Sequence, residues 1–300
     1  MKPHIQHYPL SEISHPFQGV LLDAYGVFWA GNAAGAFPGA ASAMKALVDS
    51  GKIVGILSNA TRLSSKEIEK LSRHGIHLGK HFHFLITSGE IARQTVLSKT
   101  LPFQLHVDRY YVLGGPYPEG GIHEEIFEGS SLSETEHVLE AGFIYASTPQ
   151  LSGVDQIDPS VFETHVKECI ASKLPMLCAN PDLFAHEGNP PKAVVRQGSL
   201  ARRYEELGGV VHYIGKPHTA AFASAMKEFA KFEIHSPSSI VMIGDTPETD
   251  VRGAKRFGMA SALITRTGIT ADRIEAFGEA KVLYELPSDD HPHYFLERLV

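Results

Sequence analysis

The fold is decided by an apolar run that ends in an acid, GVLLDAY at residues 19–25. A glycine-bearing turn follows it, and then a helical pattern over residues 38–51 that a proline can open and a glycine can close. The next apolar run, IVGIL at residues 53–57, ends in Ser58 and Asn59. A short strand, a helix and another short strand are typical of a βαβ unit. The sequence therefore predicts an α/β fold with a parallel sheet.

Strand-like runs separated by helical patterns recur along the chain. In one of the helical patterns, Ser64 and Glu67 have the spacing of a capping box for a helix that runs toward Gly75. The further strand-like runs of this set stand at residues 84–87, 210–214, 240–243 and 260–264. They extend the predicted parallel sheet.

A middle segment restarts the alternation as if a new sheet had begun. A helix at residues 159–171, with Asp158 as its N-cap, stands among strand-like runs at residues 110–113, 143–145 and 176–178. We therefore expect a Rossmann-like parallel-sheet core formed by residues 1–98 and 208–300. Residues 99–207 would form an inserted α/β cap domain.

Charge and composition exclude several classes of partner. The 27 basic residues against 34 acidic ones give a net charge of -7, and the basic residues are scattered, so we expect no nucleic acid and no membrane surface as partner. No stretch is apolar for the ~18 residues of a membrane span, and the first twenty residues lack the apolar run of a signal peptide. We expect a cytoplasmic protein in which Cys169 and Cys178 are buried free thiols.

Polar residues follow several of the predicted strands at the point where each strand ends. Asp23 follows the first run and Ser58-Asn59 the second, whereas GKP at residues 215–217 and GDTPETD at residues 244–250 follow two later runs. Ligands of open parallel sheets bind outside the carboxyl ends of the strands. Acids that meet at this edge would repel each other unless a cation lay between them, and hard oxygen ligands suit Mg²⁺. A hydroxyl, an amide and a lysine would supply donors for phosphoryl oxygens.

The order of these segments resembles the haloacid dehalogenase superfamily of aspartate-nucleophile hydrolases. The matching segments are LLDAYGV at 21–27, ILSNATR at 56–62, GKP at 215–217 and IGDTPETD at 243–250. The interval between the first two is too short for the helical cap of some branches, whereas the interval between the second and third is long. This placement, with Asn180-Pro181-Asp182, resembles class IIA, the NagD-like and p-nitrophenylphosphatase-like branch, whose cap is an α/β domain.

The resemblance implies a Mg²⁺-dependent hydrolase of small phosphomonoesters, or small phosphorylated metabolites, that forms an aspartyl-phosphate. Asp23 would be the nucleophile. Mg²⁺ would be held by Asp23, the backbone carbonyl of Tyr25 and Asp245, with Asp250 orienting its water shell. A homodimer that forms through the caps is compatible with this class.

The resemblance also implies which residues hold the substrate. Ser58 and Asn59 would donate hydrogen bonds to the phosphate, and Lys216 would neutralise charge between the nucleophile and the phosphoryl group. In the cap, Asn180, Asp182 and His186 stand where relatives place a substrate-contacting loop. A plain turn at Asn180-Pro181-Asp182 is an equally good interpretation.

Tyr25 breaks the family pattern. Phosphatases of this superfamily read Asp-x-Asp, and the second Asp protonates the leaving oxygen and then activates water. A phenol with a pKa of ~10 is a poor base near neutrality. Three explanations compete: a slower or narrower phosphatase, a proton donor from elsewhere such as His186, or a phosphate-binding protein without turnover.

A fourth explanation starts from Asp-Ala-Tyr-Gly at residues 23–26, which resembles the first motif of 2-haloacid dehalogenases. Those enzymes attack carbon and need no metal. Two features oppose this explanation. The cap lies in the wrong interval for those enzymes, and the acidic GDTPETD segment is a metal-binding pattern that a metal-free enzyme does not need.

Overall fold

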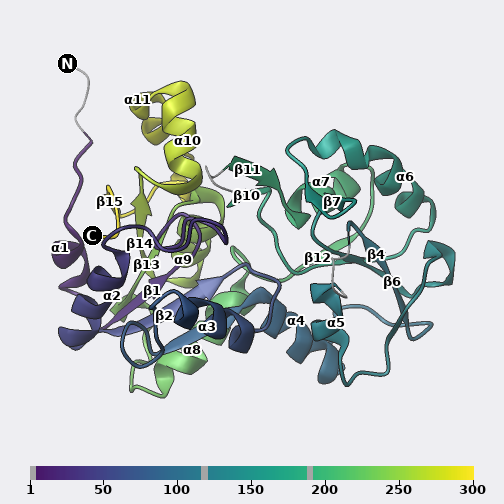
Figure 1. Ribbon diagram of the computed structural model, residues 1–300, viewed down its shortest axis with the longest axis horizontal. Helices are drawn as coiled ribbons and strands as arrows, with labels where there is room; N and C mark the ends of the chain where they lie inside the picture. Colours follow the sequence, from purple (N-terminus) through teal and green to yellow (C-terminus); the bar gives the residue numbers. More distant parts are fainter. Residues whose placement is uncertain (1–4, 116–120, 188–191) are drawn as a thin grey trace.

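The computed structural model describes residues 5–115, 121–187 and 192–300. Two parallel sheets, each with its own helices, form the two lobes seen in Figure 1. The α/β class and the parallel-sheet core that the sequence predicts are confirmed.

The first sheet has six strands, and every neighbouring pair is parallel. Across the sheet they are β15 (Tyr294–Leu296), β14 (Ala260–Ile264), β13 (Ile240–Gly244), β1 (Gly19–Leu22), β2 (Ile53–Ser58) and β3 (Phe84–Thr87). Leu22 of the central β1 is in register with Ile243 on one side and Ile56 on the other. The apolar β1 is buried along its whole length, as a strand covered on both faces must be.

Helices cover both faces of this sheet (Figure 1). Leu21 belongs to a buried cluster with residues of α4 (Ser88–Leu97), α8 (Thr219–Ala230) and α9 (Arg252–Phe257). Val20 and Leu22, its neighbours along the strand, face the other side. They pack in a cluster with residues of α1 (Leu10–Ser14), α2 (Ala40–Asp49) and α3 (Ser64–Arg73). At the β14 side lie α10 (Gly268–Phe277) and α11 (Glu279–Tyr284).

The second sheet has five strands and lies in the other lobe. Across the sheet they are β12 (Val211–Tyr213), β9 (Met176–Cys178), β6 (Phe143–Ala146), β4 (Arg109–Leu113) and β5 (Ser133–Glu134). Its helices are α5 (Ile122–Phe127), α6 (Glu163–Ala171) and α7 (Gln197–Glu206). Cys169 and Cys178 are buried and free in its core, as the sequence predicts.

Two antiparallel hairpins complete this lobe. They are formed by β7 (Gln150–Leu151) with β8 (Val154–Asp155), and by β10 (Phe184–Glu187) with β11 (Lys192–Val195). The β10/β11 hairpin lies beside α10 of the core, between the two lobes (Figure 1). It therefore brings the second lobe to the edge of the first sheet.

The strand predicted at residues 210–214 belongs to the second sheet and not to the first. The sequence places residues 210–214 in the core, but β12 pairs with β9, with Val211 opposite Met176. The last strand of the second sheet along the chain is therefore β12, which ends at Tyr213. The predicted domain boundary between residues 207 and 208 separates this strand from the rest of its sheet. An alternation of strands and helices gives the number of strands but not the sheet that each one joins, which explains the error.

The local signals of the helices are partly confirmed. Asp158 accepts a hydrogen bond from Ser160 N and caps a 3-10 turn, Pro159–Phe162, that leads into α6. The capping box of α3 is absent, because its Ser64 Oγ instead accepts from Thr87 N and its Glu67 pairs with Lys70. The other short turns are Val138–Glu140, Pro237–Ser239 and Ser288–Asp290, and a π-helical turn at Pro247–Val251. Among the described residues, no helix has the length and apolarity needed to cross a membrane.

Candidate active site

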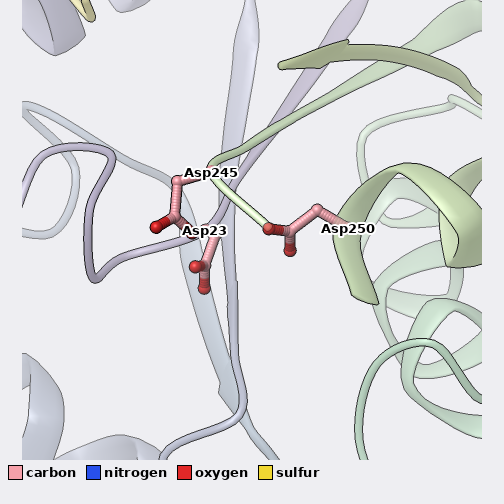
Figure 2. Close-up of side chains that lie close together, drawn as sticks. All are labelled: Asp23, Asp245 and Asp250. Atoms are coloured by element: carbon pink, nitrogen blue, oxygen red, sulfur yellow. The ribbon is translucent and has the colours of Figure 1, made fainter. Parts of the chain in front are cut away.

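Three acids gather at the carboxyl edge of the first sheet. Asp23 follows β1 and Asp245 follows β13, and their strands are neighbours in register. The π-helical turn after β13 returns the chain so that Asp250 joins them (Figure 2). One carboxylate oxygen from each acid lies within 4.8 Å of the others. A Cβ on Gly244 would lie 2.1 Å from Asp250 Cγ, so glycine is required for this close approach.

The Lys216 ammonium contacts two of these three acids, Asp23 and Asp250. Its Nζ is 2.6 Å from Asp23 Oδ1 and 2.8 Å from Asp250 Oδ1, and it donates to the Leu57 carbonyl at 2.9 Å. The side chain is only 1% exposed. Burial alone would lower the pKa of the Lys216 ammonium, but the surrounding carboxylates, Asp23 first, raise it above its usual range. Lys216 is therefore a fixed positive charge against the carboxylate of Asp23.

Asn59 holds Lys216 in place, and its side-chain amide has all its hydrogen-bonding positions occupied. Its Oδ1 accepts from Lys216 N at 2.7 Å and from Ser88 Oγ at 3.2 Å. Its Nδ2 donates to the Lys216 carbonyl at 3.1 Å and to Asp182 Oδ1 at 2.9 Å. An amide has two donor hydrogens and two acceptor lone pairs, so this side chain has no capacity left. The sequence predicts a phosphate ligand at Asn59, whereas the structure gives the side chain a positioning task.

The donor set of the cluster fits a divalent cation. Burial raises the pKa of Asp245 well above its usual range, and the carboxylates of Asp23 and Asp250 add to this. Burial also raises the pKa of Asp23, although the Lys216 ammonium opposes the rise. One ammonium does not balance three buried carboxylates, and a hard cation with oxygen ligands, such as Mg²⁺, would complete the balance.

Tyr25 lies beside this cluster and is held by other groups. Its hydroxyl donates to Asn32 Oδ1 at 3.2 Å and accepts from Lys70 Nζ at 3.3 Å. The Lys70 ammonium also lies 5.2 Å and 5.1 Å from the ring centroids of Tyr25 and Trp29. Glu67 forms a short ion pair with the same lysine. The phenol is therefore held next to a lysine beside the acidic cluster.

A cavity of about 100 Å³ lies between the two lobes, with Asp23 of the acidic cluster in its lining. Its lining from the first lobe includes Asp23, Tyr25, Ser58, Asn59, Arg62 and Glu67. Its lining from the second lobe includes Thr148, Asn180, Asp182, Glu187, Arg196 and Gln197. The structure thus brings together most of the site residues that the sequence predicts. Ser58 Oγ accepts from Ala60 N at 3.2 Å, and its hydroxyl hydrogen is available to a ligand.

Asn180 and Asp182 form a turn and also line the cavity. Asn180 Oδ1 accepts from Asp182 N at 2.9 Å, which is the hydrogen bond of an Asx turn. The turn that the sequence offers is confirmed, whereas the contact with substrate stays a prediction. Burial raises the pKa of Asp182 to about 6, although the Lys216 ammonium and the hydrogen bond from Asn59 oppose the rise.

His186 is not among the residues that line the cavity, and its predicted contact with substrate stays a prediction. Its Nε2 lies 2.5 Å from Asp272 Oδ2 of α10. Side chains alternate along a strand, and on β10 the cavity is lined by Ala185 and Glu187. His186 faces the other side, where it joins the hairpin to the core.

Several residues that line the cavity are not predicted from the sequence. Arg196 and Gln197 directly follow β11, so the rule that finds Asp23 at the end of a strand could have found them. Arg196 pairs with Glu187 at 3.2 Å. Glu67 carries no comparable signal, because its spacing from Ser64 indicates a helix cap.

Comparison with known proteins identifies the family. Residues 20–127 match the family model described as haloacid dehalogenase-like hydrolase, and residues 213–298 match one described as HAD-hydrolase-like. Chronophin from Bos taurus is 26% identical over 300 residues, which cover 94% of this chain and 90% of that protein. The crystal structure of a hydrolase of the haloacid dehalogenase-like family from Brucella suis 1330 has a TM-score of 0.79 at 22% identity, with 98% of this chain and 100% of that chain covered.

A glycerol phosphate phosphatase from Mycobacterium tuberculosis, solved in complex with magnesium, has a TM-score of 0.64 at 17% identity. The match covers 96% of this chain and 77% of that one. With the two family models, these matches place the whole chain in one group. The chain belongs to the haloacid dehalogenase-like hydrolases, and it shares its fold with a 4-nitrophenylphosphatase from Thermotoga maritima and a candidate NagD protein.

Proposed function

We propose that this hydrolase is a Mg²⁺-dependent phosphatase of small phosphomonoesters that works through an aspartyl-phosphate on Asp23. The observation that carries the proposal is the contact between Lys216 Nζ and Asp23 Oδ1, 2.6 Å long, inside a cluster of three acids. A lysine beside a carboxylate nucleophile and a cation site is the arrangement that a doubly charged phosphoryl group needs.

Asp23 is the nucleophile in this proposal. Its carboxylate attacks phosphorus, and the bond to the leaving oxygen breaks. Asp23, Asp245, Asp250 and the backbone carbonyl of Tyr25 would hold Mg²⁺. The bound cation would neutralise phosphoryl charge that the carboxylates would otherwise repel. Asp23 must be ionised to attack, and Lys216 favours that form.

Ser58 and Lys216 are the phosphate-binding side chains in this proposal. Ser58 offers a hydroxyl hydrogen at the end of β2, and Lys216 offers the positive charge between β1 and the π-helical turn. Asn59 acts through Lys216, since all its hydrogen-bonding capacity is taken. Two further predictions from the sequence, a cytoplasmic location and a homodimer, stay predictions.

The size and lining of the cavity support a small substrate. About 100 Å³ of space and polar side chains from both lobes suit a small phosphorylated metabolite. A protein with the same fold is named as a glycerol phosphate phosphatase and was solved with magnesium. Asn180 and Asp182 are the cap residues that would contact the leaving group.

Tyr25 supports a second candidate, a phosphate-binding protein without turnover, because the family's usual proton donor is absent at this position. A panel of small phosphomonoesters, assayed with Mg²⁺ and with chelator, separates the two. Release of phosphate that needs Mg²⁺ and disappears in Asp23→Asn supports the phosphatase. Binding of phosphate without hydrolysis of any ester supports the second candidate.

A further inference from the structure

The proposed reaction needs a proton donor that Tyr25 is poorly suited to be. Its hydroxyl accepts a hydrogen bond from Lys70, and the phenol's usual pKa of ~10 makes it a weak acid and a weak base in turn. The leaving oxygen of an alkyl phosphate nonetheless has to gain a proton. The donor must come from another group that lines the cavity.

Besides Asp23, three carboxyl groups line the cavity, and they belong to Glu67, Glu187 and Asp182. Glu67 is tied to Lys70 in a short ion pair. Glu187 pairs with Arg196 at 3.2 Å and accepts from Asn32 through both of its oxygens. Both carboxyl groups are therefore engaged by cationic or multiple donors, although burial also raises the pKa of Glu187.

Asp182 is bound differently. Its Oδ1 accepts one hydrogen bond, from the neutral amide of Asn59 at 2.9 Å. Its Oδ2 accepts none from the residues that the structure describes. Asp182 belongs to the second lobe and Asp23 to the first, and both line the same cavity. A leaving oxygen points away from the attacking oxygen in an in-line displacement, and thus toward the second lobe.

The charges around Asp182 suit a group that exchanges protons near neutrality. Lys216 and Arg196 favour its ionised form, whereas Asp250 and burial favour the protonated form. The charge of Asp182 in turn raises the pKa of Asp23 by electrostatic repulsion. Burial has the largest influence and raises the pKa of Asp182 to about 6.

We propose that Asp182 is the general acid and base of this enzyme, in place of the aspartate that Tyr25 replaces. The proposal rests on the proposed phosphatase function. In the first step an Asp23 oxygen bonds to phosphorus, the bond from phosphorus to the leaving oxygen breaks, and that oxygen takes the proton of Asp182. In the second step the Asp182 carboxylate takes a proton from water. The water oxygen bonds to phosphorus, and the bond to Asp23 breaks with its electron pair returning to Asp23.

This donor is connected to the lysine through one side chain. Asn59 donates to Asp182 and accepts from Lys216 N, so a single amide sets both positions. The acid belongs to the second lobe, and it lines the cavity where the two lobes meet.

The test compares two leaving groups in Asp182→Asn. Alkyl phosphates such as ethyl phosphate need protonation, whereas p-nitrophenyl phosphate needs little. A positioned acid contributes ~10²–10⁴ in rate, so we expect kcat on ethyl phosphate to fall by about that factor and the initial release of p-nitrophenol to change little. The second step also loses its base, so p-nitrophenol should appear in a burst followed by a slow steady rate.

Glu187→Gln is the matched control, because Glu187 lines the same cavity from the same lobe. It should change both substrates by similar factors and give no burst. The melting temperature of each variant checks folding. Tyr25→Asp in the Asp182→Asn background is a second variant, and it should restore part of the lost ethyl phosphate activity.

An equal fall on both substrates without a burst, or a rise in KM alone, would overturn the inference, because Asp182 would then be only a contact between the lobes. If Asp182→Asn does not fold, the wild-type pH profile decides. We expect kcat/KM for ethyl phosphate, but not for p-nitrophenyl phosphate, to fall above pH 6, and identical profiles would overturn the inference. Failure of the proposed function looks different: the wild type would hydrolyse neither ester.

Discussion

The core and the cap build their sides of the cavity from different kinds of structure. On the core side, Asp23 and Asp245 follow buried parallel strands, and Lys216 is fixed among them with 1% exposure. On the cap side, Asp182 and Glu187 belong to a turn and a two-stranded hairpin. The buried side suits a group common to all substrates, and the turn and hairpin suit groups that vary. Under the proposed function, this difference assigns phosphate to the core and the leaving group to the cap.

The largest effect is expected on the core side, from Asp23→Asn. The amide has the shape of the acid but no attacking oxygen, so hydrolysis should fall roughly 10⁴-fold or more, the scale reached when a nucleophile is removed. Steady-state kinetics with Mg²⁺ measure it. The melting temperature without metal should hold or rise, because one of the crowded carboxylates is gone. Activity equal to wild type would break the assignment of phosphate to the core.

Lys216→Met should lower turnover by about 10²–10³-fold, as the loss of one preorganised donor does. The structure adds a stability effect, because Asp23 and Asp250 would lose their buried partner. Breaking a buried pair costs roughly 3–5 kcal/mol, which a urea titration at pH 8 without metal can measure. Lys216→Arg, which keeps the charge, is the control. Unchanged stability together with unchanged turnover would mean that the ammonium is not needed.

Mg²⁺ should stabilise the protein more as pH rises. The pKa values of Asp23 and Asp245 are raised in the folded state, so without metal the folded protein binds more protons than the unfolded chain and loses stability as pH rises. Mg²⁺ binds the ionised carboxylates and offsets this loss, by about 2.7 kcal/mol at one hundred times its Kd. Melting temperatures with Mg²⁺ and with chelator should separate at pH 8 and converge near pH 5. Asp245→Asn is the control that should blunt the separation.

The smallest effect is expected from His186→Ala. This side chain pairs with Asp272 on the outside of the hairpin, away from the cavity. Its loss should leave kcat within about twofold of wild type, the range of a surface contact of ~0.5 kcal/mol. A large fall in kcat, specific to alkyl phosphates, would show that His186 rather than Asp182 supplies the proton.

The core side could be predicted from the sequence because its information is local. Asp23, Ser58 and Asp245 each follow an apolar run, and the ends of neighbouring parallel strands must meet at one edge. The GKP motif at residues 215–217 predicts Lys216 at this edge, although the strand before it, β12, joins the second sheet.

The cap side could be predicted only in part, because it depends on contacts between distant segments. Which of Ala185, His186 and Glu187 faces the cavity depends on how the β10/β11 hairpin docks on α10, and no spacing in the sequence encodes that. The side-chain amide of Asn59 likewise uses all its hydrogen-bonding capacity in four hydrogen bonds, and three of them join it to segments far away in the chain. Glu67 pairs with Lys70 within α3, and only the tertiary structure brings it to the cavity.

The most direct test of the central claim is to trap the phosphoryl group on the protein. The enzyme is mixed with p-nitrophenyl phosphate and Mg²⁺, quenched in acid within the first turnovers, digested and mapped by mass spectrometry. We expect one phosphoryl group on the peptide that carries Asp23, present with Mg²⁺ and absent with chelator. Steady hydrolysis with no phosphorylated peptide, or with the phosphoryl group on another residue, would contradict the account.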